Sequence, residues 1–192
     1  MLIINFVLVS LNIKLILKQI FFMNKSTLTL LLICLPLWMF SQGLEGLDVK
    51  QVPSVKLQDL KGNAVNTAAL GFKGPVIISF WATWCAPCKK ELNTINDVYD
   101  VWQEKTGVNL VAVSIDDEKT KSQVPVYVNG KAWDFLVLMD PNGDFKRAMG
   151  VNNVPHTFLI DKDGNIVYSH NNYAPGDEDN LFMEVKKLVS TN

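Results

Sequence analysis

The 192-residue sequence predicts an α/β fold with a central mixed β-sheet flanked by helices and an N-terminal β-hairpin extension. Two continuous apolar runs, at residues 76–80 and 110–115, have the composition of buried central strands. A helical pattern separates them, so together they predict a right-handed β-α-β unit. Two further strands joined by an Asp-Gly turn, within residues 154–168, predict antiparallel pairing as well.

The first predicted elements are a hairpin and a buried strand. Residues 55–66 alternate between polar and apolar side chains, with a turn at residues 61–63, and this pattern predicts a small β-hairpin. Gly74-Pro75 then interrupts the chain before the apolar run 76–80. We expect this run to be a central strand because all its residues except Ser79 are apolar.

A helix is expected directly after that strand. Its apolar residues recur at helical spacing, which predicts one continuous helix with a single buried face. Gly107 is placed to end it. The apolar positions of this face are Leu92, Ile95, Val98 and Trp102.

The middle of the chain leaves two alternatives open. Residues 124–130 form either a strand that enters an Asn-Gly hairpin or a short helix with Pro125 in its first turn. Residues 135–139 predict a further strand or extended segment, and residues 144–149 a short helix. Propensity alone does not decide between the two alternatives for residues 124–130.

The C-terminal part predicts a hairpin followed by a helix. The hairpin pairs residues 154–160 with residues 166–168 across the Asp-Gly turn. Residues 178–189 are amphipathic at helical spacing. Three apolar side chains of this helix are expected to face inward: Leu181, Val185 and Leu188.

Residues 1–42 are interpreted as a leader and residues 43–192 as one domain. From Met23, a short basic segment, an apolar run at 28–40 and small or polar residues follow one another in the order of a signal peptide. The run is shorter than a membrane-spanning helix requires. We therefore expect synthesis to start at Met23 and the domain to be exported, with an uncleaved N-terminal anchor as the alternative.

Charge argues against a nucleic-acid partner. Three of the 18 basic residues and none of the 19 acidic residues lie in residues 1–41, so the remainder carries a net charge of about −4. A nucleic-acid-binding domain would need a clustered basic face. We expect no nucleic acid to bind.

Removal of the leader removes Cys34 and leaves Cys85 and Cys88 as the only cysteines. Their spacing places both sulfur atoms in the first turn of a helix, where one disulfide can join them. Unpaired backbone N–H groups at that end favour a thiolate over a thiol. In an exported protein such a pair is more readily a redox dithiol than a structural link.

Two stretches, residues 76–92 and 150–164, resemble the thioredoxin-like fold, and most closely the TlpA/ResA-like branch of exported thiol–disulfide oxidoreductases. The first contains Trp-Ala-Thr-Trp-Cys-Ala-Pro-Cys, and the second contains Val-Pro before a strand and the Asp-Gly turn. The resemblance covers about residues 50–190. It implies a thioredoxin-like domain that reduces protein disulfides without a cofactor. The family includes reductases that prepare apocytochromes for haem attachment.

The resemblance also implies roles for individual residues. Cys85 would be the attacking thiol, Cys88 the resolving thiol, and the two would form the active-site disulfide. Pro155 would be the family's cis-proline beside that disulfide, and Val154 would offer backbone groups to an extended substrate. Trp81 and Trp84 flank the site and are expected to form its apolar rim, although packing alone would also explain them.

Three polar residues near the dithiol need separate interpretation. Glu91 matches an acidic residue that family members keep close to it, and a partly buried carboxylate can exchange a proton with Cys88. The alternative for Glu91 is a solvated helix glutamate. Ser79 stands where cytosolic thioredoxins carry a buried Asp, which favours Glu91 in the proton role. His156 replaces the usual Thr after the proline, and either tunes the Cys85 thiolate or is a polar strand-end residue.

Other functions remain as alternatives. Zinc would need Cys85, Cys88, His156 and His170 as ligands, but the histidines lack paired spacing, so we expect no metal. A thiol peroxidase on the same fold would need an arginine near its cysteine, and Arg147 is distant in sequence. A thiol oxidase would use the same cysteine pair to oxidise substrate thiols instead of reducing disulfides. A binding module would keep the fold without using the cysteines for catalysis.

The sequence therefore predicts an exported thiol–disulfide oxidoreductase of the periplasm or cell envelope. Its expected substrates are disulfides of other envelope proteins. We also expect an upstream electron donor in the membrane, and membrane contact only through the leader.

Overall fold

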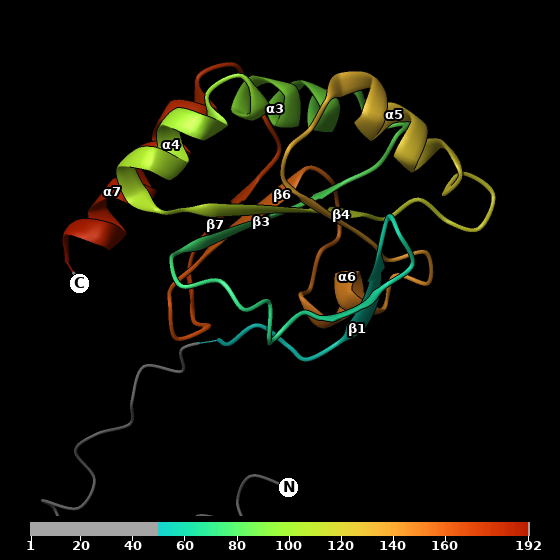
Figure 1. The fold of residues 1–192 in the computed structure, drawn as a ribbon, viewed down its shortest axis with the longest axis horizontal. Coiled ribbons are helices and arrows are strands. Elements are labelled where there is room, and N and C mark those ends of the chain that lie inside the picture. Colours follow the sequence, from blue (N-terminus) through green and yellow to red (C-terminus); the bar gives the residue numbers. More distant parts are fainter. Residues whose placement is uncertain (1–49, 192) are drawn as a thin grey trace, which may run out of the picture. The chain divides into compact units, whose positions relative to one another are not determined.

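The computed structural model describes residues 50–191, and its core is a seven-stranded mixed sheet with the order β2-β1-β5-β4-β3-β6-β7 (Figure 1). The predicted leader, the boundary at residue 43 and Cys34 lie outside the described residues. The strands are β1 Lys56–Asp59, β2 Ala64–Asn66, β3 Val76–Trp81, β4 Asn109–Ser114, β5 Leu136–Met139, β6 His156–Ile160 and β7 Ile166–Asn171.

Helices cover both faces of this sheet. In Figure 1, α3, α4, α5 and α7 lie on one face, and α6 lies on the other. Between residues 50 and 191, no helix is both long and apolar enough to cross a membrane. The helix bounds are α3 Ala86–Asn96, α4 Tyr99–Thr106, α5 Gln123–Lys131, α6 Asp144–Ala148 and α7 Asp177–Ser190.

Strand β3 is the centre of the fold and leads directly to the cysteines. It pairs in parallel with β4 and antiparallel with β6, and every one of its residues is buried. Burial on both faces explains its continuous apolar run. The predicted β-α-β unit and the mixed sheet are both confirmed.

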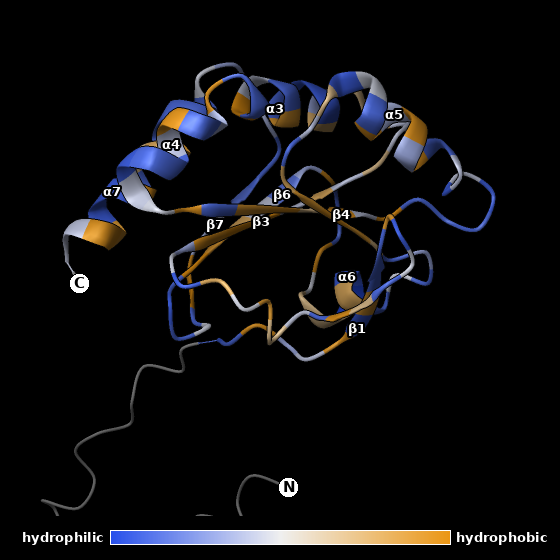
Figure 2. Cartoon of the chain, viewed as in Figure 1, coloured by the Kyte–Doolittle hydropathy of each residue, from blue (hydrophilic) through white to orange (hydrophobic). Residues whose placement is uncertain are grey.

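Alternation along β3 divides the interior into two apolar clusters. Ile77 and Trp81 pack with α3, α4, α5 and α7, whereas Ile78 and Phe80 pack with α6 and the N-terminal hairpin. Figure 2 shows the apolar strands between helices whose outer faces are hydrophilic. The sheet therefore separates two sets of buried side chains, and of the described residues only the partly buried Ile115 and Val154 pack against both.

The prediction of one continuous helix after the cysteines is wrong, because the structure has two helices there, α3 and α4. Asp97 ends α3, and Val98, which was expected on the buried face, is 37% exposed. The break turns α4 so that Trp102 stacks on Phe182 of α7, with ring centroids 4.6 Å apart. Gly107 ends α4 with a φ of 68°, as predicted.

Residues 124–130 are helical, so of the two alternatives the short helix is correct and the hairpin strand is not. Pro125 lies in the first turn of α5, where its missing N–H removes no helical hydrogen bond. Val124 and Val128, four residues apart, are both buried. Tertiary burial of this face outweighs the hairpin preference of Asn129-Gly130, which lies in the last turn.

The remaining predicted elements are confirmed. The hairpin β1–β2 is present, and β1 also pairs with β5, so the extension joins the main sheet. The hairpin β6–β7 turns at Gly164, where the Asp161 carboxylate accepts the N–H groups of Asp163 and Asn165. Helix α7 closes the chain with Leu181 and Val185 buried and Leu188 packed against them.

Candidate active site

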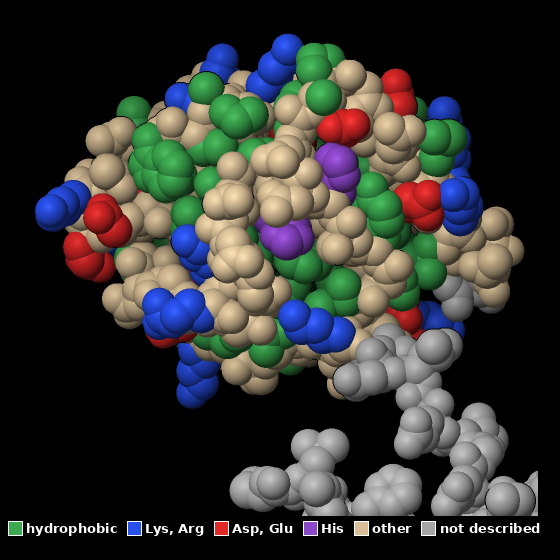
Figure 3. All heavy atoms as spheres, turned by 180° about the vertical axis from the view of Figure 1, so that it is seen from behind, with side chains coloured by type: hydrophobic (Ala, Val, Ile, Leu, Met, Phe, Trp, Pro, Cys, Tyr) green, Lys and Arg blue, Asp and Glu red, His purple; other side chains and the backbone are tan. Residues whose placement is uncertain are grey.

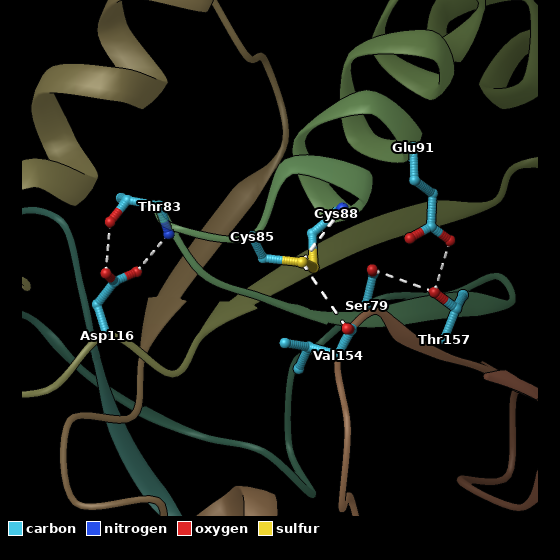
Figure 4. Close-up of a disulfide and its surroundings, with 8 residues drawn as sticks. All are labelled: Ser79, Thr83, Cys85, Cys88, Glu91, Asp116, Val154 and Thr157. Atoms are coloured by element: carbon cyan, nitrogen blue, oxygen red, sulfur yellow. Dashed lines mark hydrogen bonds between the residues drawn. A yellow bond between two sulfur atoms is a disulfide. The ribbon is translucent and has the colours of Figure 1, made fainter. Parts of the chain in front are cut away.

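The site is built around a disulfide at the N-terminus of α3. Cys85 and Cys88 are joined, with their Cα atoms 5.4 Å apart (Figure 4). Cys85 is the N-cap residue, and the backbone N–H of Cys88 donates to its Sγ at 3.3 Å. Cys88 is fully buried, whereas 5% of Cys85 is exposed. The two cysteines therefore occupy the predicted positions, the first at the cap and the second inside the first turn.

Local sequence explains why the helix begins there. Cys85 is extended, with φ −88° and ψ 101°, and Pro87 follows within the first turn, where its fixed φ suits a helix. The N–H of Cys85 donates to the carbonyl of Ala82, which closes a turn before the helix. In the reduced protein, a Cys85 thiolate at this cap would face the positive end of the helix dipole.

Strand β6 brings the second predicted motif to the disulfide. The peptide bond between Val154 and Pro155 is cis, as predicted, and the Val154 carbonyl oxygen lies 3.8 Å from Cys85 Sγ. Trp84 is 62% exposed beside Cys85 in the chain. Trp81 does not belong to an apolar rim, because it is fully buried and packs against Trp133 of the core.

Glu91 is buried rather than solvated, with 4% of the residue exposed. It lies one turn after Cys88 on α3, so both residues share one side of the helix (Figure 4). Its Oε1 accepts a 2.8 Å hydrogen bond from Thr157 Oγ1, and the Thr157 hydroxyl also lies 3.1 Å from that of Ser79. Glu91 Oε2 is buried and has no hydrogen-bond partner within residues 50–191.

Burial raises the pKa of Glu91 from 4.5 to about 7. The hydrogen bond from Thr157 opposes this increase because it stabilises the carboxylate, and the nearby Ser79 hydroxyl acts in the same direction. The negative charges of Asp177 and Glu178, at the start of α7, raise the pKa further. The group can therefore gain or lose a proton near neutral pH.

His156 lies at the start of β6, on the other face of the sheet from Thr157 and Glu91. Its ring stacks on Phe158, with centroids 4.3 Å apart, and burial lowers its pKa. Both histidines of the chain reach the surface seen in Figure 3. His170 lies 3.2 Å from the carboxylate of Asp177.

The groups required by the alternative functions lie elsewhere. Among residues 50–191, no three His, Cys, Asp or Glu side chains form a group that could hold a metal ion. Arg147, the arginine that a peroxidase would need, lies on α6 and binds Asp144 and the carbonyl of Asn142. Helix α6 covers the opposite face of the sheet from α3.

Sequence reasoning missed Thr157, which joins strand β6 to the carboxylate on α3. The one signal was a threonine directly before the apolar run 158–160 of a buried strand, whose residues alternate between two faces. The Asp177 and Glu178 charges near Glu91 were also missed. Their approach depends on how α7 packs against α3, which the local sequence does not encode.

Comparison with known proteins gives a consistent relationship. Residues 49–169 match the AhpC/TSA family. The chain is 37% identical over 118 residues to the thiol-disulfide oxidoreductase ResA of Bacillus anthracis, a match that covers 62% of this chain and 66% of that protein. The matched part is thus just under two thirds of that relative's length.

Solved structures show the same fold. An uncharacterized thioredoxin-like protein from Porphyromonas gingivalis is 45% identical, with a TM-score of 0.66 over 72% of this chain and 92% of that one. A structure from Chlorobium tepidum, described as a thiol:disulfide interchange protein DsbE, is 26% identical, with a TM-score of 0.65 over 75% and 99% of the two chains. With its thioredoxin-like fold and its match over residues 49–169, the chain belongs to the AhpC/TSA family.

Proposed function

We propose that the protein is an exported thiol–disulfide oxidoreductase that reduces disulfides of other cell-envelope proteins. The observation that carries this proposal is the Cys85–Cys88 pair at the N-terminus of α3, beside the cis bond before Pro155. The names of the ResA relatives and of the DsbE-type structure support the same chemistry.

The first step uses Cys85 of the reduced protein. Its thiolate, favoured by the helix N-terminus, attacks one sulfur of the substrate disulfide. A bond forms between Cys85 Sγ and that sulfur, the substrate S–S bond breaks, and the other substrate sulfur leaves as a thiolate that takes a proton from water. The product of this step is a mixed disulfide.

The second step uses Cys88 and Glu91. Cys88 gives its proton to the Glu91 carboxylate, whose Oε2 is free to receive it because Thr157 binds Oε1. The Cys88 thiolate then attacks Cys85 Sγ, which forms the Cys85–Cys88 disulfide and releases the second substrate thiolate. This thiolate takes its proton from water, and Glu91 releases the proton of Cys88 to water, so the substrate gains two electrons and two protons in all. An upstream donor in the membrane, itself a dithiol, returns the two electrons.

The substrate would lie across the segment that contains the cis peptide bond between Val154 and Pro155. We assign Trp84, Val154, Pro155 and His156 to substrate binding. The exposed Trp84 ring offers an apolar contact, and the Val154 backbone offers polar groups to an extended peptide. We assign the protein to the periplasm or cell envelope on the signal-like residues 23–42, with apocytochromes as one candidate class of substrate.

Trapping the mixed disulfide tests this proposal. In a Cys88→Ala variant the second step cannot occur, so a disulfide-containing protein such as insulin should remain covalently attached to Cys85. The Cys85→Ser variant is the matched control and should trap nothing. Wild-type protein should reduce insulin with dithiothreitol as donor. Equal insulin reduction by wild type and Cys85→Ser would contradict the proposal.

The redox potential tests the direction of electron flow. Equilibration of the Cys85–Cys88 pair with glutathione should give a reduction potential of about −300 mV for a reductant. A reduction potential of about −120 mV would instead assign the protein as a thiol oxidase. Consumption of hydrogen peroxide by the reduced protein, at a rate above that of free thiols, would assign it as a peroxidase.

A further inference from the structure

A second buried carboxylate lies close to the disulfide, at the end of the neighbouring strand. Asp116 follows β4 and is 1% exposed. Its Oδ2 accepts the backbone N–H of Thr83 at 2.8 Å and the hydroxyl of Ser114 at 2.8 Å, and its Oδ1 accepts the hydroxyl of Thr83 at 2.5 Å. A buried carboxyl group that accepts three hydrogen bonds is a fixed part of the structure.

Two of these bonds hold the short loop between β3 and α3. The loop comprises residues 82–85, and Thr83 lies inside it (Figure 4). Thr83 binds Asp116 through both its backbone and its side chain, across 33 positions of sequence. The loop is therefore attached through Thr83 to the end of β4, in addition to its attachment through β3.

The position of Cys85 depends on this loop. The N–H of Cys85 donates to the carbonyl of Ala82, so residues 82–85 form one turn with Thr83 inside it. The same turn presents Cys85 Sγ to the N–H of Cys88. Displacement of Thr83 would move the sulfur away from the helix N-terminus that stabilises its thiolate.

We propose that Asp116 is a positioning residue that holds the 82–85 turn through Thr83 and so keeps Cys85 at the cap of α3. This inference rests on the proposed function only in taking Cys85 as the attacking thiol. Within the described residues, none of the hydrogen bonds of Asp116 goes to sulfur, so its effect on Cys85 passes through Thr83. It differs in this way from Glu91, which lies on the helix of the cysteines.

The test compares two buried threonines. Thr83→Val removes the hydroxyl bond to Asp116 but keeps the backbone bond and the side-chain shape. Thr67→Val is the matched control, because Thr67 is also buried and its hydroxyl donates at 2.6 Å to the carbonyl of Pro53, in the N-terminal hairpin. The full chain is reduced, and the rate of iodoacetamide alkylation at Cys85 is measured against pH by peptide mass spectrometry.

We expect Thr83→Val to shift the alkylation curve of Cys85 to higher pH and to slow the reaction about fivefold at neutral pH, the size of a helix-end charge interaction. Thr83→Ser, which keeps the hydroxyl, should restore the wild-type curve. Thr67→Val should leave the curve in place even where urea unfolding shows an equal loss of stability. Asp116→Ala should shift the curve in the same direction as Thr83→Val.

Two results would overturn the inference: a Thr83→Val curve that superimposes on the wild type, or an equal shift in Thr67→Val, which would indicate general loosening. If Asp116→Ala does not fold, the two threonine variants still decide the question. Alkylation needs no disulfide substrate. Failure of the wild type to reduce insulin would therefore contradict the proposed function, but the alkylation curves would still test the role of Asp116.

Discussion

Thr157 Oγ1 donates a 2.8 Å hydrogen bond to Glu91 Oε1, although the two residues lie 66 positions apart. The bond joins β6, which begins after the cis-proline, to α3, which carries both cysteines. The Thr157 hydroxyl has one proton, so when that proton points to Glu91 the contact with Ser79 is made by the Ser79 hydroxyl. The three side chains form a directed chain of hydrogen bonds that ends on the carboxylate.

Replacement of Glu91 by glutamine should change how stability depends on pH. The pKa of Glu91 is raised from 4.5 to about 7 in the folded protein, so its contribution to stability is complete below pH 4.5 and is lost as pH rises to about 7. Over that interval the wild type should lose about 3 kcal/mol relative to Glu91→Gln. Urea unfolding of the oxidised proteins at several pH values measures this difference, and parallel curves for the two proteins would contradict it.

Thr157→Val should raise the pKa of Glu91 further. The variant removes the hydrogen bond that stabilises the carboxylate but leaves the burial that destabilises it. The carboxyl carbon resonance of Glu91, followed by NMR during a pH titration, reports the change directly. Thr157→Ser keeps the hydroxyl and should titrate like the wild type. A lowered pKa in Thr157→Val would mean that the hydrogen bond favours the protonated acid.

Asp177→Asn should have the opposite effect and lower the pKa of Glu91. The Asp177 charge raises that pKa, and an asparagine would remove the charge while its oxygen can still accept the N–H of Ala174. Glu184→Gln is the matched control on the same helix, because Glu184 pairs with Lys187 and does not act on Glu91. The same NMR titration should shift in Asp177→Asn alone. Equal shifts in both variants would indicate an effect of net charge.

Local sequence was sufficient to predict the parts of the site that lie in one segment. Cys85, Cys88 and their place at a helix cap follow from a strand, a Cys-x-x-Cys sequence and a helical pattern. Glu91 could be proposed because it matches an acidic residue of the resembled family, but its burial could not, because burial depends on β6 and α7 as well as on α3. The break between α3 and α4 was missed for a related reason: an apolar repeat fits one straight helix and two shorter ones equally well.

Contacts between distant segments were not predictable. Thr157 meets Glu91 because β6 pairs with β3 in a register that places Thr157 opposite Ser79. A shift of one residue would turn Thr157 to the other face of the sheet. Asp116 meets Thr83 because β4 and β3 end side by side. Such registers are set by the packing of the whole sheet, and no single segment specifies them.

Gly74→Ala should destabilise the protein by about 1–3 kcal/mol, the usual cost of overpacking. A Cβ atom at Gly74 would overlap the carbonyl oxygen of Gly107, and a backbone atom cannot rotate away. Gly130→Ala is the contrasting variant, because a Cβ there meets no atom within 4 Å and the residue lies in α5. It should stabilise the helix by about 0.5–1 kcal/mol. Urea unfolding of both variants gives the two values, and the same sign for both would refute the contact.

Trp84→Ala should weaken substrate binding with little effect on folding. Trp84 is 62% exposed, so its truncation removes little buried area from the folded protein, yet it directly precedes Cys85, where a substrate must approach. An aromatic contact at a protein interface commonly contributes about 1–2 kcal/mol or more, which predicts a rise of about tenfold in KM for insulin reduction. Val126→Ala is the control, because Val126 is 73% exposed and lies on α5. Its KM should equal that of the wild type, and an unchanged KM in Trp84→Ala would remove Trp84 from the substrate-binding surface.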